Sequence, residues 1–143
     1  MHKLLQRRRI MCGRLAGYVV VTCFLLAPAT ASASLPLVAT DGVEATSTTT
    51  ARVEGNANPN GEKTTLRALY AVASSRWCTS HGAKGKASKT APIKLGSGNI
   101  EYSEILVPLS GLAPNQLYCT ELVAHSRSGT AHGGQLSFMT PSE

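Results

Sequence analysis

The stretch GLAPNQLYCTELVAHSRSG at residues 111–129 constrains the fold more than any other part of the sequence. A glycine, a proline and a tyrosine stand before a run of alternating side chains, which ends in a polar turn. Alternation is typical of a β-strand, because successive side chains of a strand point to opposite faces of a sheet. The two faces would carry Tyr118, Thr120, Leu122 and Ala124 on one side and Cys119, Glu121, Val123 and His125 on the other.

Similar alternating segments recur between residues 37 and 140, separated by turns rich in Gly, Pro, Asn and Ser. We expect strands at residues 37–46, 49–57, 64–73, 101–112, 117–125 and 130–140, and a polar loop over residues 79–99. Pro108 cannot donate a backbone hydrogen bond, so its strand is expected at a sheet edge or at a bulge. About six to seven short strands, with no sustained helical period, predict an all-β sandwich or barrel.

Residues 1–33 differ from the rest of the chain and are expected to be a secretory signal peptide. Five basic residues open the chain: Lys3, Arg7, Arg8, Arg9 and Arg14. The apolar run LAGYVVVTCFLL and the small residues APATASAS follow, which is the layout of an export signal. Cleavage is expected after Ala33, with Ala31 as the second choice. Alternatives are an uncleaved anchor, for which the run is short, and a twin-arginine signal at Arg7–Arg9.

Removal of this segment changes what the charge of the chain means. The 143 residues carry a formal charge of +6, from 14 Lys and Arg and 8 Asp and Glu. Residues 1–33 hold the five bases named above and no acid, so residues 34–143 keep nine bases against eight acids, a charge of +1. The basic character of the whole chain therefore does not indicate a nucleic-acid partner.

Three segments of the sequence, taken together, resemble a bacterial fibronectin type III domain: ARVEGNANPNGEKTTLRALYAV, LVPLSGLAPNQLYCTELVAH and SRSGTAHGGQLSFMT. The most specific feature is the spacing of Leu112, Pro114 and Tyr118 before the alternating strand, although Gln116 stands where the family often has threonine. The resemblance implies an immunoglobulin-like β-sandwich of antiparallel strands over residues 34–143. It also implies a tyrosine corner, with Leu112 in the core, Pro114 stiffening the crossing, and the Tyr118 hydroxyl bonded to backbone slightly upstream.

Two cysteines remain once Cys12 and Cys23 leave with the signal peptide. An even number of cysteines in an exported chain makes a Cys78–Cys119 disulfide the default expectation. The resemblance places Cys78, after the third strand, and Cys119, at the start of the sixth, at the same end of neighbouring strands. Two free buried thiols are the alternative.

Catalytic and metal sites receive little support from the sequence. Cys78 and His81 have a spacing that metal ligands use, and Cys119 and His125 could complete the set, but the second pair lacks a tight spacing. Six residues of strand separate Cys119 from His125 by about 20 Å, too far for a nucleophile and its base. His81 and His132 have no motif around them, and the single acids are expected on a solvated surface. We therefore expect no catalytic residues, no metal and no cofactor.

One uneven distribution of charge remains. Bases fall between Glu62 and Glu101 without any acid, and four of them crowd the expected loop: Lys84, Lys86, Lys89 and Lys94. Two interpretations stay open, a solvated mobile loop and a patch for an anionic glycan, wall polymer or membrane surface. A nucleic-acid ligand is not expected, since the loop has no aromatic residues on which bases could stack.

These observations predict a secreted, non-catalytic binding or adhesion module. Its partner would be a protein or a glycan at the cell surface, and its mature form would not span a membrane. The alternative is a small secreted enzyme or inhibitor that uses its loops on the same sandwich.

Overall fold

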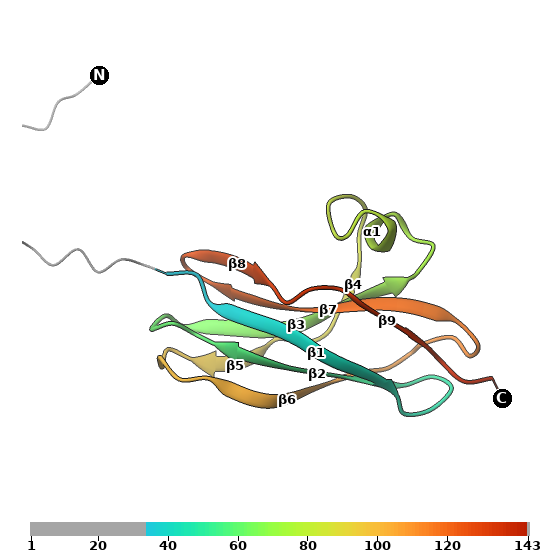
Figure 1. Ribbon diagram of the computed structural model, residues 1–143, viewed down its shortest axis with the longest axis horizontal. Helices are drawn as coiled ribbons and strands as arrows, with labels where there is room; N and C mark the ends of the chain where they lie inside the picture. Colours follow the sequence, from blue (N-terminus) through green and yellow to red (C-terminus); the bar gives the residue numbers. More distant parts are fainter. Residues whose placement is uncertain (1–33, 143) are drawn as a thin grey trace, which may run out of the picture. The chain divides into compact units, whose positions relative to one another are not determined.

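The computed structural model describes residues 34–142, so the expected signal peptide and its cleavage sites lie outside the described residues. Two antiparallel sheets face each other (Figure 1). The small sheet has the order β1 (Leu37–Ala45), β2 (Ala51–Asn58), β6 (Tyr102–Leu109). The large sheet is built on β3 (Thr64–Val72) and β7 (Leu117–Ser126). Strand β3 also pairs with β4 (Ser88–Lys89) and β5 (Ile93–Gly96), and β7 with β8 (Gly129–His132) and β9 (Leu136–Met139).

This architecture confirms the expected all-β, immunoglobulin-like sandwich. Residues 34–142 contain nine strands rather than six or seven, because β4 and β5 lie within the expected loop and the expected last strand is divided into β8 and β9. Strand β6 pairs with β2 and forms an edge of the small sheet, which confirms the edge position expected from Pro108.

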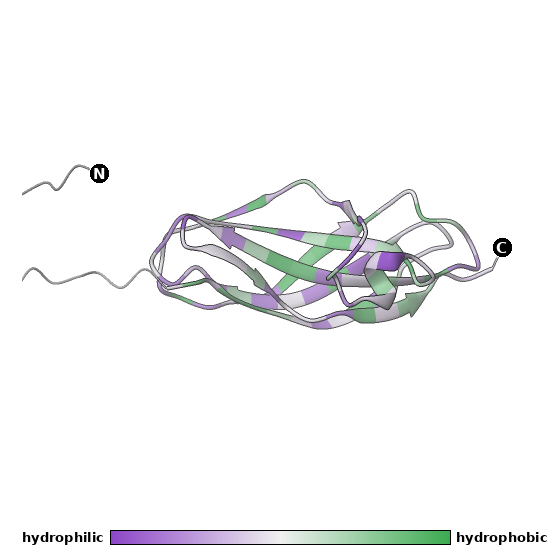
Figure 2. Cartoon of the chain, turned by 90° about the horizontal axis from the view of Figure 1, so that it is seen from above, coloured by the Kyte–Doolittle hydropathy of each residue, from purple (hydrophilic) through white to green (hydrophobic). Residues whose placement is uncertain are grey.

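The core lies between the sheets and follows from the alternation in the sequence. Along β2 the burial pattern changes at every residue, with Val53 fully buried between the exposed Arg52 and Glu54. Figure 2 shows the same alternation of hydrophobic and hydrophilic residues along the strands. The buried apolar residues of the core are Ala51, Val53, Ala57, Leu66, Ala68, Leu95, Val107, Leu109, Leu112, Tyr118, Leu122, Ala124 and Phe138.

The first strand connects the two sheets at its centre, where its pairing with β2 shifts register between Thr40 and Gly42. There the Thr40 hydroxyl accepts a hydrogen bond from the Leu122 amide of the large sheet at 2.9 Å. The Thr40 amide donates to the Gly133 carbonyl, also at 2.9 Å. A Cβ at Gly133 would lie 2.7 Å from the Thr40 hydroxyl oxygen, so the absence of a side chain permits this approach.

The expectation of a polar loop over residues 79–99 is confirmed only in part, since residues 80–87, 90–92 and 97–99 lie outside helices and strands but the rest do not. The one-turn helix α1 (Arg76–Thr79) precedes two short strands, β4 and β5, which pair with β3. Leu95 is buried in the core, and Thr90 exchanges hydrogen bonds with the Ala68 backbone. These contacts depend on residues about twenty positions away, which is why the local sequence did not reveal them.

Candidate functional site

The bend before β7 contains the residues that the resemblance singled out. Tyr118 is 7% exposed, and its hydroxyl accepts a hydrogen bond from the Ala113 amide at 2.9 Å. Its ring stacks on Phe138 with 5.6 Å between the ring centres, and Leu112 is buried beside it. Pro114 lies at the surface of the bend. The bend therefore serves to hold the sandwich together.

A disulfide joins Cys78 on α1 to Cys119 on β7, as expected, with 5.9 Å between the Cα atoms. The Ser75 hydroxyl caps α1 by accepting a hydrogen bond from the Cys78 amide at 3.2 Å. Trp77 is 4% exposed and packs with the two cysteines in a second apolar cluster. Helix α1 is thereby fixed on the outer face of the large sheet, the face turned away from the small sheet (Figure 1).

The disulfide also decides between the alternatives left open for the cysteines. Because each sulfur is bonded to the other, neither cysteine is a free thiol and neither can act as a thiolate ligand or a nucleophile. In residues 34–142, no group of three or more His, Cys, Asp and Glu side chains is arranged to hold a metal ion.

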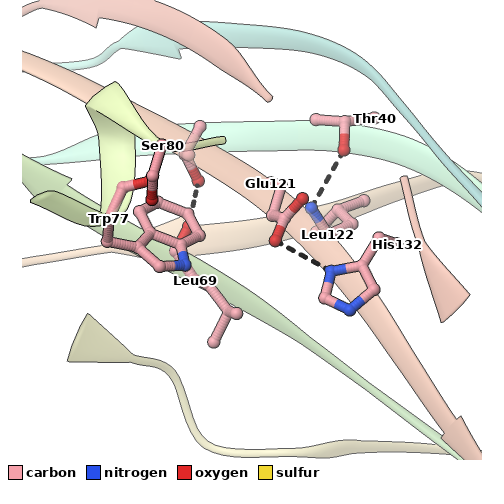
Figure 3. A network of polar contacts seen from close by, with 8 residues as sticks. Thr40, Leu69, Trp77, Ser80, Glu121, Leu122 and His132 are labelled. Atoms are coloured by element: carbon pink, nitrogen blue, oxygen red, sulfur yellow. Dashed lines mark hydrogen bonds and ion pairs between the residues drawn. The ribbon is translucent and has the colours of Figure 1, made fainter. Parts of the chain in front are cut away.

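Glu121 was expected on a solvated surface, and this expectation is wrong. Its side chain lies under Gly82 on the outer face and is only 4% exposed. Its carboxylate approaches the ring Nδ1 of His132 at 3.0 Å. Figure 3 shows the Trp77 indole and the His132 ring on opposite sides of this carboxylate. The loop that follows α1 buries Glu121, and an alternating pattern cannot predict a cover over the outer face.

The structure divides the four lysines of the expected patch into two pairs. Lys84 and Lys86 lie in the connection after α1, where the Ser80 hydroxyl accepts a hydrogen bond from the Lys84 amide at 2.8 Å. Lys89 pairs with Leu69, and Lys94 pairs with Thr65. Directly opposed residues of an antiparallel pair share a face. Lys89 and Lys94 therefore lie on the outer face, because the intervening Leu66 and Ala68 are buried inward.

Two further cations join the second pair. Arg67 lies on β3 between Thr65 and Leu69 and so points to the same outer face. Lys63 directly precedes β3 and borders the same groove as Lys94. Sequence reasoning placed both in the acid-free stretch but missed that they share the outer face with Lys89 and Lys94. We call Lys63, Arg67, Lys89 and Lys94 the cationic strip.

Two grooves open on the described surface. One, of about 420 Å³, contains part of the cationic strip and is lined by Lys63, Thr64, Thr65, Lys94, Gly96 and Ser97. The other, of about 380 Å³, lies between the edges of the two sheets and includes Tyr70, Lys89, Pro92 and Pro108 in its lining.

Within residues 34–142, no helix has the length and apolar character needed to cross a bilayer.

No protein-family model matches the chain, and no curated protein matches it. Solved structures do resemble it. The solution structure of the sensor domain of the anti-sigma factor RsgI4 from Pseudobacteroides cellulosolvens has a TM-score of 0.54 at 14% identity, over 76% of each chain. A second structure of that sensor domain gives 0.53 at 17% identity, over 78% of this chain and all of that one.

The third fibronectin III domain of the human KIAA0343 protein is also similar, with a TM-score of 0.49 at 20% identity, over 76% of this chain and 86% of that chain. At these identities, the likeness to the sensor domain shows the fold alone, and a fold of this kind supports many unrelated functions. The arrangement of its own two sheets gives the chain an immunoglobulin-like β-sandwich fold, and its own surface is the guide to its function.

Proposed function

We propose that this chain is exported, with residues 1–33 removed and residues 34–143 forming the mature domain. The observation within the described part that supports export is the Cys78–Cys119 disulfide, since such bonds persist in oxidising compartments. Intact-mass measurement of the protein recovered from culture medium tests this proposal. A mature chain beginning at Ser34 is expected. Retention of the full mass inside the cell would contradict it.

We further propose that the mature domain is a non-catalytic binding module at the cell surface. The outer face of the large sheet supports this proposal, because its side chains are held on paired strands and beside a helix fixed by a disulfide. A surface fixed in this way can bind without first paying the entropy of ordering loops. Chemically, the cationic strip offers three ammonium groups and one guanidinium, which hold anions but supply neither a nucleophile nor a proton acceptor.

Retention on the envelope fraction of the organism that makes the protein tests the binding function. Protein purified after expression of the full chain is incubated with washed envelopes, and the unbound fraction is measured against protein concentration. A saturable isotherm that fresh unlabelled protein competes away is expected. A linear, non-competed isotherm, or substrate turnover by the purified protein, would contradict the proposal.

A further inference from the structure

The two sheets of this domain carry opposite charge. Among the described residues, the small sheet and the segment leading into β6 hold five acids and one base: Asp41, Glu44, Glu54, Glu101 and Glu104 against Arg52. The large sheet and its connections hold two acids and eight bases: Glu62 and Glu121 against Lys63, Arg67, Arg76, Lys84, Lys86, Lys89, Lys94 and Arg127. A domain whose mature charge is close to zero therefore has one acidic and one basic sheet.

Local ion pairs do not cancel this separation. Arg52 is paired with Glu44 at 3.2 Å, so the single base of the small sheet is already used. Glu121 is buried beside His132, and Glu62 accepts a hydrogen bond from the Ser128 amide. Within residues 34–142, none of the four cations of the cationic strip forms an ion pair. Their charge is thus available to a ligand.

The cationic strip has a defined geometry on the large sheet. Lys94 lies opposite Thr65 and Lys89 opposite Leu69, and these two β3 residues are separated by about 13 Å along the strand. Arg67 lies midway between them. At one end of this line, Lys63 and Lys94 border the 420 Å³ groove, together with the hydroxyl-bearing Thr65 and Ser97. A row of cations that begins at a groove suits a linear ligand with repeated negative charges.

Protection of the sheet edge is a simpler explanation for part of this pattern. Lysines on edge strands prevent pairing with other chains, and both β4 and β5 are edge strands. That role would account for Lys89 and Lys94. It does not account for Arg67, which lies on β3 between the edge strands and β7, nor for Lys63, which precedes β3.

We propose that the groove and the cationic strip bind an acidic polysaccharide, with Lys63 and Lys94 holding one of its carboxylate or sulfate groups and Arg67 and Lys89 the groups further along. This inference rests on the binding function proposed above. The polar side chains that line the groove carry hydroxyl or ammonium groups, which can bind the hydroxyl and acid groups of a polysaccharide. A single-stranded nucleic acid would instead require exposed aromatic side chains for stacking, and none lines this groove.

Matched double variants test this inference. Binding of dextran sulfate, polygalacturonate and neutral dextran is measured by titration calorimetry at two salt concentrations. We expect the wild type to bind the two acidic polymers, more weakly at higher salt, and not neutral dextran. The variant K63Q/K94Q should lose about tenfold or more in affinity, since it removes two charge-assisted contacts. The variant K84Q/K86Q makes the same change in net charge on exposed residues and should lose less than about threefold.

Other outcomes would overturn the inference. Equal losses in both double variants would mean that net charge, and not this groove, attracts the polymer. Equal binding of neutral dextran would show that acid groups are not recognised. Vesicles of phosphatidylcholine with phosphatidylserine serve as a second probe; binding to them that depends on Lys63 and Lys94, without binding to the acidic polymers, would replace the polysaccharide by a membrane surface. Retention on envelopes without binding to either acidic polymer would refute this inference and leave the proposed binding function standing.

Discussion

The small and large sheets have similar residues on their inner faces but differ on their outer faces. Inside, both sheets present small and branched apolar residues at alternate positions, as Val53 on β2 and Leu66 on β3 illustrate. Outside, the small sheet leaves Arg52 and Glu54 exposed, whereas the large sheet buries Glu121 under a segment fixed by a disulfide. The inner faces specify the fold, whereas the features that distinguish the large sheet from the small one lie on its outer face.

Loss of the disulfide is expected to have the largest effect on stability. It would also release the segment that covers the outer face of the large sheet, which is the feature that distinguishes the two sheets. The variant Cys78→Ala/Cys119→Ala removes a link across 41 residues, worth up to about 4 kcal/mol in the chain-entropy model. Urea unfolding followed by circular dichroism measures the loss. Trp77 fluorescence should show its cluster loosening before the sheets unfold, and fully coincident transitions would contradict a separate outer cluster.

A glycine on the small sheet tests how closely the inner faces approach. A Cβ at Gly55 would overlap the Ala39 carbonyl oxygen and the Leu122 side chain of the opposite sheet. Gly55→Ala should therefore destabilise the domain by about 3 kcal/mol, through overpacking against backbone that cannot move freely. Gly42→Ala on β1 is the matched control, because its Cβ would meet nothing closer than 3.9 Å. Similar unfolding midpoints for the two variants would contradict the packing described.

Tyr118→Phe tests the bend that carries the chain from the small sheet to the large one. The substitution keeps the ring stacked on Phe138 and removes the acceptor for the Ala113 amide. A loss of about 1 kcal/mol in unfolding free energy is expected, the usual net contribution of one hydrogen bond. An unchanged melting temperature in calorimetry would show that the hydroxyl plays no part in stability.

The smallest expected effect concerns Glu62, in the turn between β2 and β3. The hydrogen bond from Ser128 lowers the pKa of Glu62 from its usual value of 4.5. A carboxyl whose pKa is lower in the folded state stabilises the protein above its unfolded-state pKa, and loses that contribution as the pH falls through its folded-state pKa. Glu62→Gln should therefore be slightly less stable than wild type at pH 7, and the difference should vanish as the pH falls through the folded-state pKa of Glu62. A difference that persists in acid would point to a cause other than ionisation.

Alternation predicted the inner faces well, because burial against a facing sheet imposes a period of two on each strand. It failed over residues 76–99 for identifiable reasons. Helix α1 is too short to show a helical period. Strands β4 and β5 are only two and four residues long, and they pair with β3, which is distant in the sequence. For the same reason, the sequence alone could not predict the cationic strip. Which lysines flank Arg67 depends on the registers of β4 and β5 against β3, and no local pattern encodes those registers.

The proposed binding surface of this domain is the cationic strip on its large sheet. Titration of the isotope-labelled protein with dextran sulfate, followed by amide chemical shifts, tests it most directly. The largest shift changes are expected at residues 63–67, 89 and 93–97. Largest changes on β1 and β2, or in the connection at residues 80–87, would contradict it.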